Sequence, residues 1–200
     1  MYSLQRPCFL LRFPTRVGWR FACMVQYAQA NTAEERRQLM HPHAALIEEF
    51  YQAFARRDAE GMIACYHPNV TFSDPVFQQL QSDEASAMWR MLTKSSADLD
   101  LTYRAVTADD AQGQADWTAI YTFSQTGRKV RNEIHAAFQF QDGKIITHQD
   151  TFDLWRWAGM ALGPQGRLLG WTPLMQRAIR QRARSRLEAF MRQQATAAQA

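Results

Sequence analysis

The sequence predicts an α+β fold, with N-terminal helices packed on a cone-shaped, curved antiparallel sheet and a basic amphipathic helix at the C-terminus. Between residues 42 and 95 the apolar residues recur at helical spacing, whereas from Asp98 to Phe152 they alternate with a period of two. The pair Asp142-Gly143 joins the last two alternating runs, and Asp-Gly in that place is typical of a tight β-hairpin. Helices followed by long antiparallel strands define the α+β class.

The two ends of the chain differ from its middle in charge. The formal net charge is +4, but Arg residues concentrate at both ends and the middle is acidic. We expect residues 1–40 to be a disordered or mis-assigned extension, with a targeting segment or an ordered arm as alternatives. Residues 41–157 then form the domain, and residues 158–200 form a lid segment and the C-terminal helix. The basic ends give no reason to expect a nucleic-acid partner for the domain.

The cysteines and the hydropathy pattern bear on the compartment. Cys8, Cys23 and Cys65 are widely spaced and form no CxxC pair, which favours a reducing environment. No apolar run approaches the ~18–20 residues of a membrane span. We therefore expect a cytoplasmic protein without a membrane partner.

Helices are expected first along the domain. Pro42 is favoured at a first helical position, and the apolar spacing that follows it continues to Arg57. Asp58 caps a second, shorter helix, which His67-Pro68 is expected to end. Ser82 or Asp83 caps a third helix, whose apolar stripe contains Ala85, Met88, Trp89 and Leu92.

Strands are expected between and after these helices. A short strand runs from Val70 to Asp74 and is stopped by Pro75. The long strands are expected at residues 99–105, 115–123, 132–140 and 146–152. In the last of them, the inward face carries Ile146, His148, Asp150 and Phe152.

An ionisable pair on an inward face has to be explained. His148 and Asp150 are two residues apart, so both point to the same side, roughly 7 Å from each other. That separation does not assure a direct hydrogen bond, but it allows each group to perturb the pKa of the other. The alternative is a purely structural role, in which the two residues form a buried pair whose hydrogen bonds are satisfied.

Three short stretches make the chain recognisable. Asp58-Ala-Glu-Gly-Met lies on the second helix, Tyr66-His-Pro-Asn precedes Val-Thr-Phe-Ser-Asp-Pro, and Gly143-Lys-Ile-Ile opens the last strand. With this order of elements, residues 42–157 resemble the nuclear transport factor 2-like superfamily and, within it, the SnoaL-like domain group, a fold relative of ketosteroid isomerase. The resemblance implies a cone that takes a small apolar molecule, and a homodimer.

The resemblance also implies roles for individual residues. The proton-shuttling aspartate of the ketosteroid isomerases falls on Asp74, and the acid that SnoaL-type cyclases carry on a late strand falls on Asp150. The two oxyanion-stabilising positions fall on Phe50 and Ala136, which have no suitable group, so the steroid isomerase reaction itself is not expected. Asp74, Asp150 and His148 are thus the candidate catalytic residues. Asp74 before a proline could instead be a turn former that caps nearby amides.

The remaining candidates would form the wall of the cone. The candidate ligand-binding residues are Phe50, Trp89, Asn132, Phe138 and Phe152. No metal site is visible in the sequence, and no glycine-rich phosphate loop follows a strand, so we expect neither a metal nor a cofactor. Large aromatic residues in this pattern are more often core than binding groups.

The C-terminal part is expected to modify the cone. Trp155, Trp157, Met160 and Leu162 could form a lid. The basic helix that starts at Thr172-Pro173 could pack on its own domain, on a second subunit or on an anionic membrane, and the first is the default. Two functions of different class follow: an enzyme of proton transfer, cyclisation or hydration, or a non-catalytic ligand-binding or dimerisation module.

Overall fold

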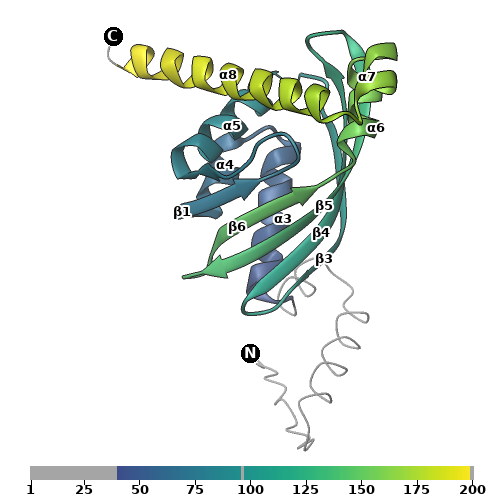
Figure 1. The fold of residues 1–200 in the computed structure, drawn as a ribbon. Helices are drawn as coiled ribbons and strands as arrows, with labels where there is room; N and C mark the ends of the chain where they lie inside the picture. The colour runs from purple at the N-terminus through teal and green to yellow at the C-terminus, as the bar shows by residue number, and fades with distance from the viewer. Residues whose placement is uncertain (1–39, 96, 199–200) are drawn as a thin grey trace, which may run out of the picture. The chain divides into compact units, whose positions relative to one another are not determined.

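The computed structural model describes residues 40–95 and 97–198, and the expectations for residues 1–39 lie outside this part. Figure 1 shows the arrangement of the elements. The helices are α3 (Pro42–Ala55), α4 (Ala59–Ala64), α5 (Ser82–Ser95), α6 (Leu154–Ala161), α7 (Pro164–Leu169) and α8 (Pro173–Ala198). The strands are β1 (Tyr66–Ser73), β2 (Leu80–Gln81), β3 (Asp100–Ala108), β4 (Gln112–Phe123), β5 (Arg128–Gln141) and β6 (Lys144–Thr151). The predicted α+β class is confirmed.

The described strands form one six-stranded sheet in the order β2-β1-β6-β5-β4-β3. The sheet is mixed: four of the described strand pairs are antiparallel, as expected, whereas β1 and β6 pair in parallel. The physical reason is the route of the chain: α5 carries it from the β1–β2 edge to the opposite edge, and the meander β3-β4-β5-β6 then returns to β1. Figure 1 shows that this sheet is strongly curved.

Local backbone features support the curvature and the last hairpin. The register of β3 against β4 shifts between Arg104 and Thr107, and Ala105 in this interval has a φ of 53°. An extra residue of this kind bends a strand and increases its twist. At the β5–β6 turn, Asp142 and Gly143 have φ of 52° and 71°, which is the pair of positive values that a type I′ turn requires.

The boundary between α4 and β1 differs from the expectation. Asp58 accepts a hydrogen bond from the Gly61 amide and caps α4 as predicted, but the helix ends at Ala64. His67-Pro68 lies inside β1 rather than at a helix end. The β1–β6 register shifts between Tyr66 and Thr71, which accommodates the proline because it has no amide hydrogen for the ladder.

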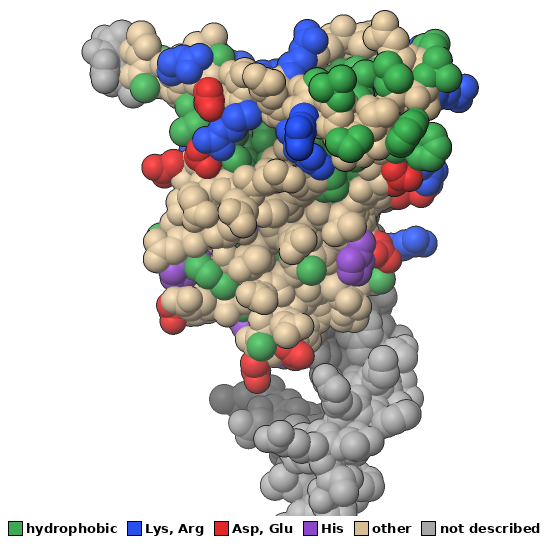
Figure 2. All heavy atoms as spheres, in the orientation of Figure 1, with side chains coloured by type: hydrophobic (Ala, Val, Ile, Leu, Met, Phe, Trp, Pro, Cys, Tyr) green, Lys and Arg blue, Asp and Glu red, His purple; other side chains and the backbone are tan. Residues whose placement is uncertain are grey.

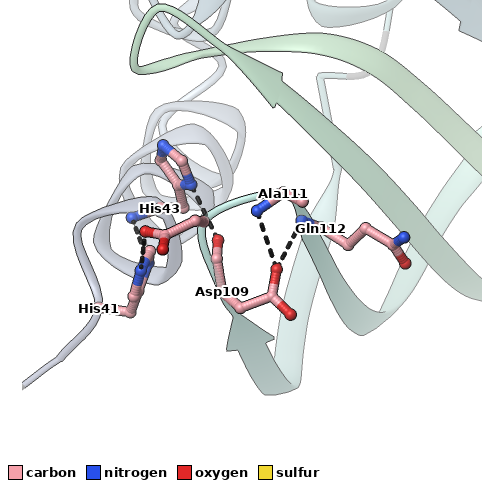
Figure 3. Close-up of polar contacts among 6 residues, drawn as sticks. His41, His43, Asp109, Ala111 and Gln112 are labelled. Atoms are coloured by element: carbon pink, nitrogen blue, oxygen red, sulfur yellow. Dashed lines mark hydrogen bonds and ion pairs between the residues drawn. The ribbon is translucent and has the colours of Figure 1, made fainter.

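Two histidines fix the start of α3 to the β3–β4 turn (Figure 3). His43 Nδ1 donates to the carbonyl of Asp109 at 2.9 Å, so this histidine carries its proton on Nδ1. His41 Nδ1 accepts from the amide of His43, which leaves Nε2 to donate to Asp110 at 3.2 Å. The Asp109 carboxylate accepts from the amides of Ala111 and Gln112 and shapes the turn itself.

The C-terminal helix α8 lies across the same end of the sheet as α6 and α7, beside α5 (Figure 1). Leu187 is fully buried, and Phe190 is half-buried against the main core. Leu174, near the start of the helix, is 80% exposed. None of the helices in the described ranges is both long enough and apolar enough to cross a membrane.

Candidate functional site

A cavity of about 290 Å³ lies between the concave face of the sheet and the helices α5 and α8. Most of its wall is apolar, with side chains such as Phe72, Trp89, Ile134 and Trp157. Two carboxyl groups, those of Asp74 and Asp150, are its acidic lining residues. A mostly apolar pocket with a few convergent polar groups is the usual form of a small-molecule site.

Asp150 ends a line of hydrogen-bonded side chains that crosses the core. Trp89 Nε1 donates to the Tyr66 hydroxyl at 2.9 Å, and this hydroxyl lies 2.7 Å from His148 Nδ1. His148 Nε2 lies 3.1 Å from Asp150 Oδ1, which also accepts from Trp117 Nε1 at 3.2 Å. The His148 side chain is fully buried and that of Asp150 is 3% exposed. The direct hydrogen bond between His148 and Asp150, which the spacing of two residues on a strand did not assure, is therefore present.

The hydrogen bonds in this line fix the direction of each donor. An indole N–H can only donate, so the Tyr66 oxygen accepts from Trp89. A carboxylate can only accept, so a neutral His148 donates from Nε2 to Asp150, and its Nδ1 accepts the hydrogen of the Tyr66 hydroxyl. The proton of a neutral His148 then sits on Nε2 and points at Asp150. Both donors to Asp150 reach Oδ1, so among the described residues its Oδ2 has no protein donor. This oxygen is available to a molecule in the cavity.

Asp74 contributes to the cavity from the end of β1. Its Oδ1 accepts from the amide of Val76 at 2.6 Å and from that of Phe77. Asp74 therefore caps a turn, as the alternative interpretation of an aspartate before a proline predicted. Burial raises the pKa of the Asp74 carboxyl to about 7, the amide of Phe77 opposes this shift, and the charge of Asp150 adds to it. The same side chain thus shapes a turn through Oδ1 and exchanges a proton near neutral pH.

The structure places the predicted site residues in two groups. Asp74, Asp150, Trp89, Asn132 and Phe152 line the cavity. His148, Phe50 and Phe138 do not reach it. His148 lies behind Asp150, and the rings of Phe50 and Phe138 pack on the His148 ring, with centroid distances of 5.3 Å and 4.4 Å.

Several residues of the site were missed from the sequence. Tyr66 on β1 and Trp117 on β4 form hydrogen bonds with the His148–Asp150 pair. These contacts join segments far apart in the chain, so no local sequence pattern predicts them. Tyr121 also lines the cavity and accepts from Trp157 Nε1 at 2.9 Å. Tyr51 is fully buried, and its hydroxyl has no hydrogen-bond partner in the described part of the chain; burial and then the charge of Asp150 raise its pKa.

Thiol and metal chemistry have little support in the described residues. Burial raises the pKa of the Cys65 thiol to about 12, which keeps it protonated and unreactive. Residues 40–95 and 97–198 contain no group of three or more His, Cys, Asp or Glu side chains that could hold a metal ion.

The curved sheet and the helices packed on it form a cone-shaped α+β domain, whose apolar cavity is lined by two carboxyl groups. The model of the SnoaL-like domain matches residues 47–148, about half of the chain. The chain belongs to the SnoaL-like family. This confirms the resemblance found from the sequence motifs. No curated protein sequence matches the chain significantly.

Solved structures share the fold at low sequence identity. An NTF2-like protein of unknown function from Burkholderia pseudomallei has a TM-score of 0.54 and 19% identity, with 61% of this chain and 98% of that chain covered. The LEH-like epoxide hydrolase of M. tuberculosis has a TM-score of 0.51 and 16% identity, with 66% and 96% covered. IdmH from Streptomyces antibioticus, a proposed polyketide cyclase, has a TM-score of 0.52 and 17% identity, with 60% and 98% covered. At these identities the likeness shows the fold alone.

Proposed function

We propose that this SnoaL-like protein binds a small apolar molecule in its cone and catalyses proton transfer, cyclisation or hydration with Asp74 and Asp150 as acid and base. The observation that carries the proposal is the pair of carboxyl groups on one apolar cavity, of which one is oriented by two donors and the other has a pKa of about 7. General acid–base catalysis requires a donor and an acceptor poised near the working pH.

Each side chain has a distinct task in this proposal. Asp150 removes a proton through Oδ2, because its Oδ1 is held by Trp117 and His148. Asp74, protonated at and below about pH 7, returns a proton to the substrate. His148 touches Asp150 and not the cavity, so it is a positioning residue whose tautomer is set by Tyr66.

The reactions of the structural relatives are consistent with this range of chemistry. One relative is called an epoxide hydrolase and another a proposed polyketide cyclase. Hydrolysis of an epoxide and cyclisation of a polyketide both require proton transfer. The alternative function is a non-catalytic ligand-binding or dimerisation module, which the same apolar cavity would serve without turnover.

A ligand screen followed by a matched pair of variants tests the proposal. Thermal shift against apolar ketones, epoxides and polyketide-like aromatics should identify compounds that stabilise the protein. With any compound that is converted, Asp150→Asn should abolish turnover and retain binding. Asp116→Asn, the same change on the exposed face beside His135, should leave turnover intact. Binding without turnover in the wild type would favour the alternative function.

A further inference from the structure

One face of α8 closes the cavity and carries two arginines. The residues of α8 that line the cavity are Met175, Ala178, Ile179, Arg182, Ala183 and Arg186. Their spacing of three and four residues is that of one continuous stripe on a helix. Four members of the stripe are apolar, whereas Arg182 and Arg186 place two positive charges at one end of an otherwise apolar wall.

Two other arginines of the same helix are held by protein groups. Arg180 donates to the carbonyl of Pro75 at 2.9 Å, and Arg184 pairs with Glu84 and with Glu188. Within the described residues, no hydrogen bond or ion pair is formed by the side chains of Arg182 and Arg186. Like charges four residues apart on a helix repel each other, so this arrangement lowers helix stability unless an anion lies between them.

The basic character continues outside the cavity. A second, more open groove shares Met91, Ser95 and Arg186 with the cavity and adds Lys94 from the end of α5. The side chain of Lys94 also has no partner among the described residues. Figure 2 shows Lys and Arg side chains gathered around the end of the molecule where α8 lies.

Nearby acids are already engaged elsewhere. Asp98 accepts from Thr122 and pairs with Lys129 at 2.8 Å. Glu84 and Glu188 are both held by Arg184. No acidic residue lines the outer groove. Within the described part of the protein, Arg182, Arg186 and Lys94 therefore form no ion pair with an acid, although Asp74 and Asp150 line the same cavity.

We propose that the natural ligand is an apolar, aromatic or polycyclic molecule that carries an anionic group, which Arg182, Arg186 and Lys94 bind at the α8 end of the cavity. This inference rests on the proposed function in one respect, because it assumes that the cavity binds a ligand. The apolar body occupies the cone, where it meets Asp74 and Asp150, and the carboxylate, sulfate or phosphate stays at the mouth. Guanidinium groups suit such planar or tetrahedral oxyanions because they donate two parallel hydrogen bonds.

The anion also fixes the orientation of the ligand. A group held at α8 prevents the negative end from reaching Asp74 and Asp150, where like charges would repel it. The opposite end of the molecule then faces the two carboxyl groups. The arginines of α8 thereby determine which atoms of the substrate meet the acid and the base.

Two fluorescent probes with the same aromatic skeleton test this inference without any turnover. Anilinonaphthalene sulfonate carries a sulfonate, and phenylnaphthylamine lacks it. We expect the wild type to bind the sulfonate probe about tenfold more tightly than the neutral probe. The double variant Arg182→Gln/Arg186→Gln should lose this difference and keep its affinity for the neutral probe. Added salt should weaken only the sulfonate probe.

Two further variants control for charge and location. Arg177→Gln/Arg192→Gln removes the same charge from residues of α8 that do not line the cavity, and should change neither affinity. Ala178→Trp fills the mouth of the cavity from an exposed position and should weaken both probes. This variant separates the cavity from the exposed apolar side chains Leu168, Trp171 and Leu174, to which such probes could also bind.

The outcomes separate this inference from the proposed function. Equal wild-type affinity for the two probes, or equal losses in the two double variants, would overturn the anion site and leave an apolar binding pocket. Insensitivity of both probes to Ala178→Trp would also overturn it, because the probes would then bind elsewhere. Failure of the wild type to bind either probe counts against the proposed apolar pocket as well as the anion site.

Discussion

The Tyr66 hydroxyl donates its hydrogen to His148 Nδ1 over 2.7 Å, because a neutral His148 that donates from Nε2 to Asp150 leaves Nδ1 as an acceptor. A residue on β1 thus stabilises the tautomer of His148 whose proton faces Asp150. The orientation of the candidate base depends on a side chain that does not line the cavity.

Tyr66→Phe is expected to weaken both stability and turnover. The change leaves the buried Trp89 N–H without its acceptor and His148 Nδ1 without its donor, so the free energy of unfolding should fall by about 1–3 kcal/mol. His148 is then free to adopt the other tautomer, which cannot donate to Asp150. Urea unfolding measures the first effect. Tyr103→Phe is the control, because Tyr103 is half-buried and stacks on Tyr51 without a hydroxyl bond in the described structure; it should change stability by less than ~0.5 kcal/mol.

Asp74→Asn and Asp150→Asn should leave the melting temperature unchanged or raise it. In both residues all the described hydrogen bonds reach Oδ1, and an asparagine oxygen can keep them while the buried charge is removed. Turnover should be lost in both variants. Asp150→Ala is the contrasting change, because it leaves Trp117 Nε1 and His148 Nε2 unpaired and should cost about 1–3 kcal/mol. Destabilisation by both asparagine variants would show that the carboxylates are structural groups.

Local sequence features, both single residues and short-range periodicity, predicted several parts of this fold. The start of α3 at Pro42, the cap at Asp58 and the turn at Asp142-Gly143 each follow from the chemistry of one or two residues. The inward positions of His148 and Asp150 follow from the two-residue period of a strand. These features need no knowledge of the rest of the chain.

Features that join distant segments were not predictable in the same way. The parallel pairing of β1 with β6 depends on the whole path of the chain between them. Tyr66 meets His148 only through that pairing, and it lies in a stretch that the following proline led us to assign to a helix end. The stripe of α8 that contains Arg182 is visible in the sequence as a spacing, but only its packing beside α5 shows that it faces a cavity.

Deletion of residues 1–40 should leave the domain folded. The periodic pattern starts at Pro42, and the contacts of His41 and His43 with the β3–β4 turn secure α3 from its first residue. We expect the melting temperature of the truncated protein to stay within a few degrees of the full chain. Circular dichroism melts of the two proteins make the comparison. A large drop would show that the extension is structural.

A homodimer through the exposed face of the sheet remains a prediction. His135 and Asp116 form an exposed pair at 2.8 Å on this face, from neighbouring strands β5 and β4. His135→Glu would put a second carboxylate beside Asp116 in each protomer, and these like charges should repel those on the same face of the partner and dissociate the dimer. Light scattering at micromolar concentration measures the mass, with Gln193→Glu on the exposed side of α8 as the control for added charge. A monomeric wild type would contradict the prediction.

The stability of the protein should decrease between about pH 4 and pH 7 because of Asp74. Burial raises the pKa of its carboxyl from its ordinary value of 3.8 to about 7, so in this window the folded state keeps a proton that the unfolded state has lost. The slope of the unfolding free energy with pH follows the difference in bound protons, unfolded minus folded, which is negative here. The stabilisation that protonated Asp74 contributes is complete below pH 4, falls as the pH rises, and no longer changes above about pH 7. Asp74→Asn removes this slope, so its stability relative to the wild type should improve as the pH rises. Urea unfolding of the two proteins at a series of pH values measures the difference. A difference that does not change with pH, or that shrinks toward pH 7, would show that Asp74 titrates at or below its ordinary value and is no proton donor at neutral pH.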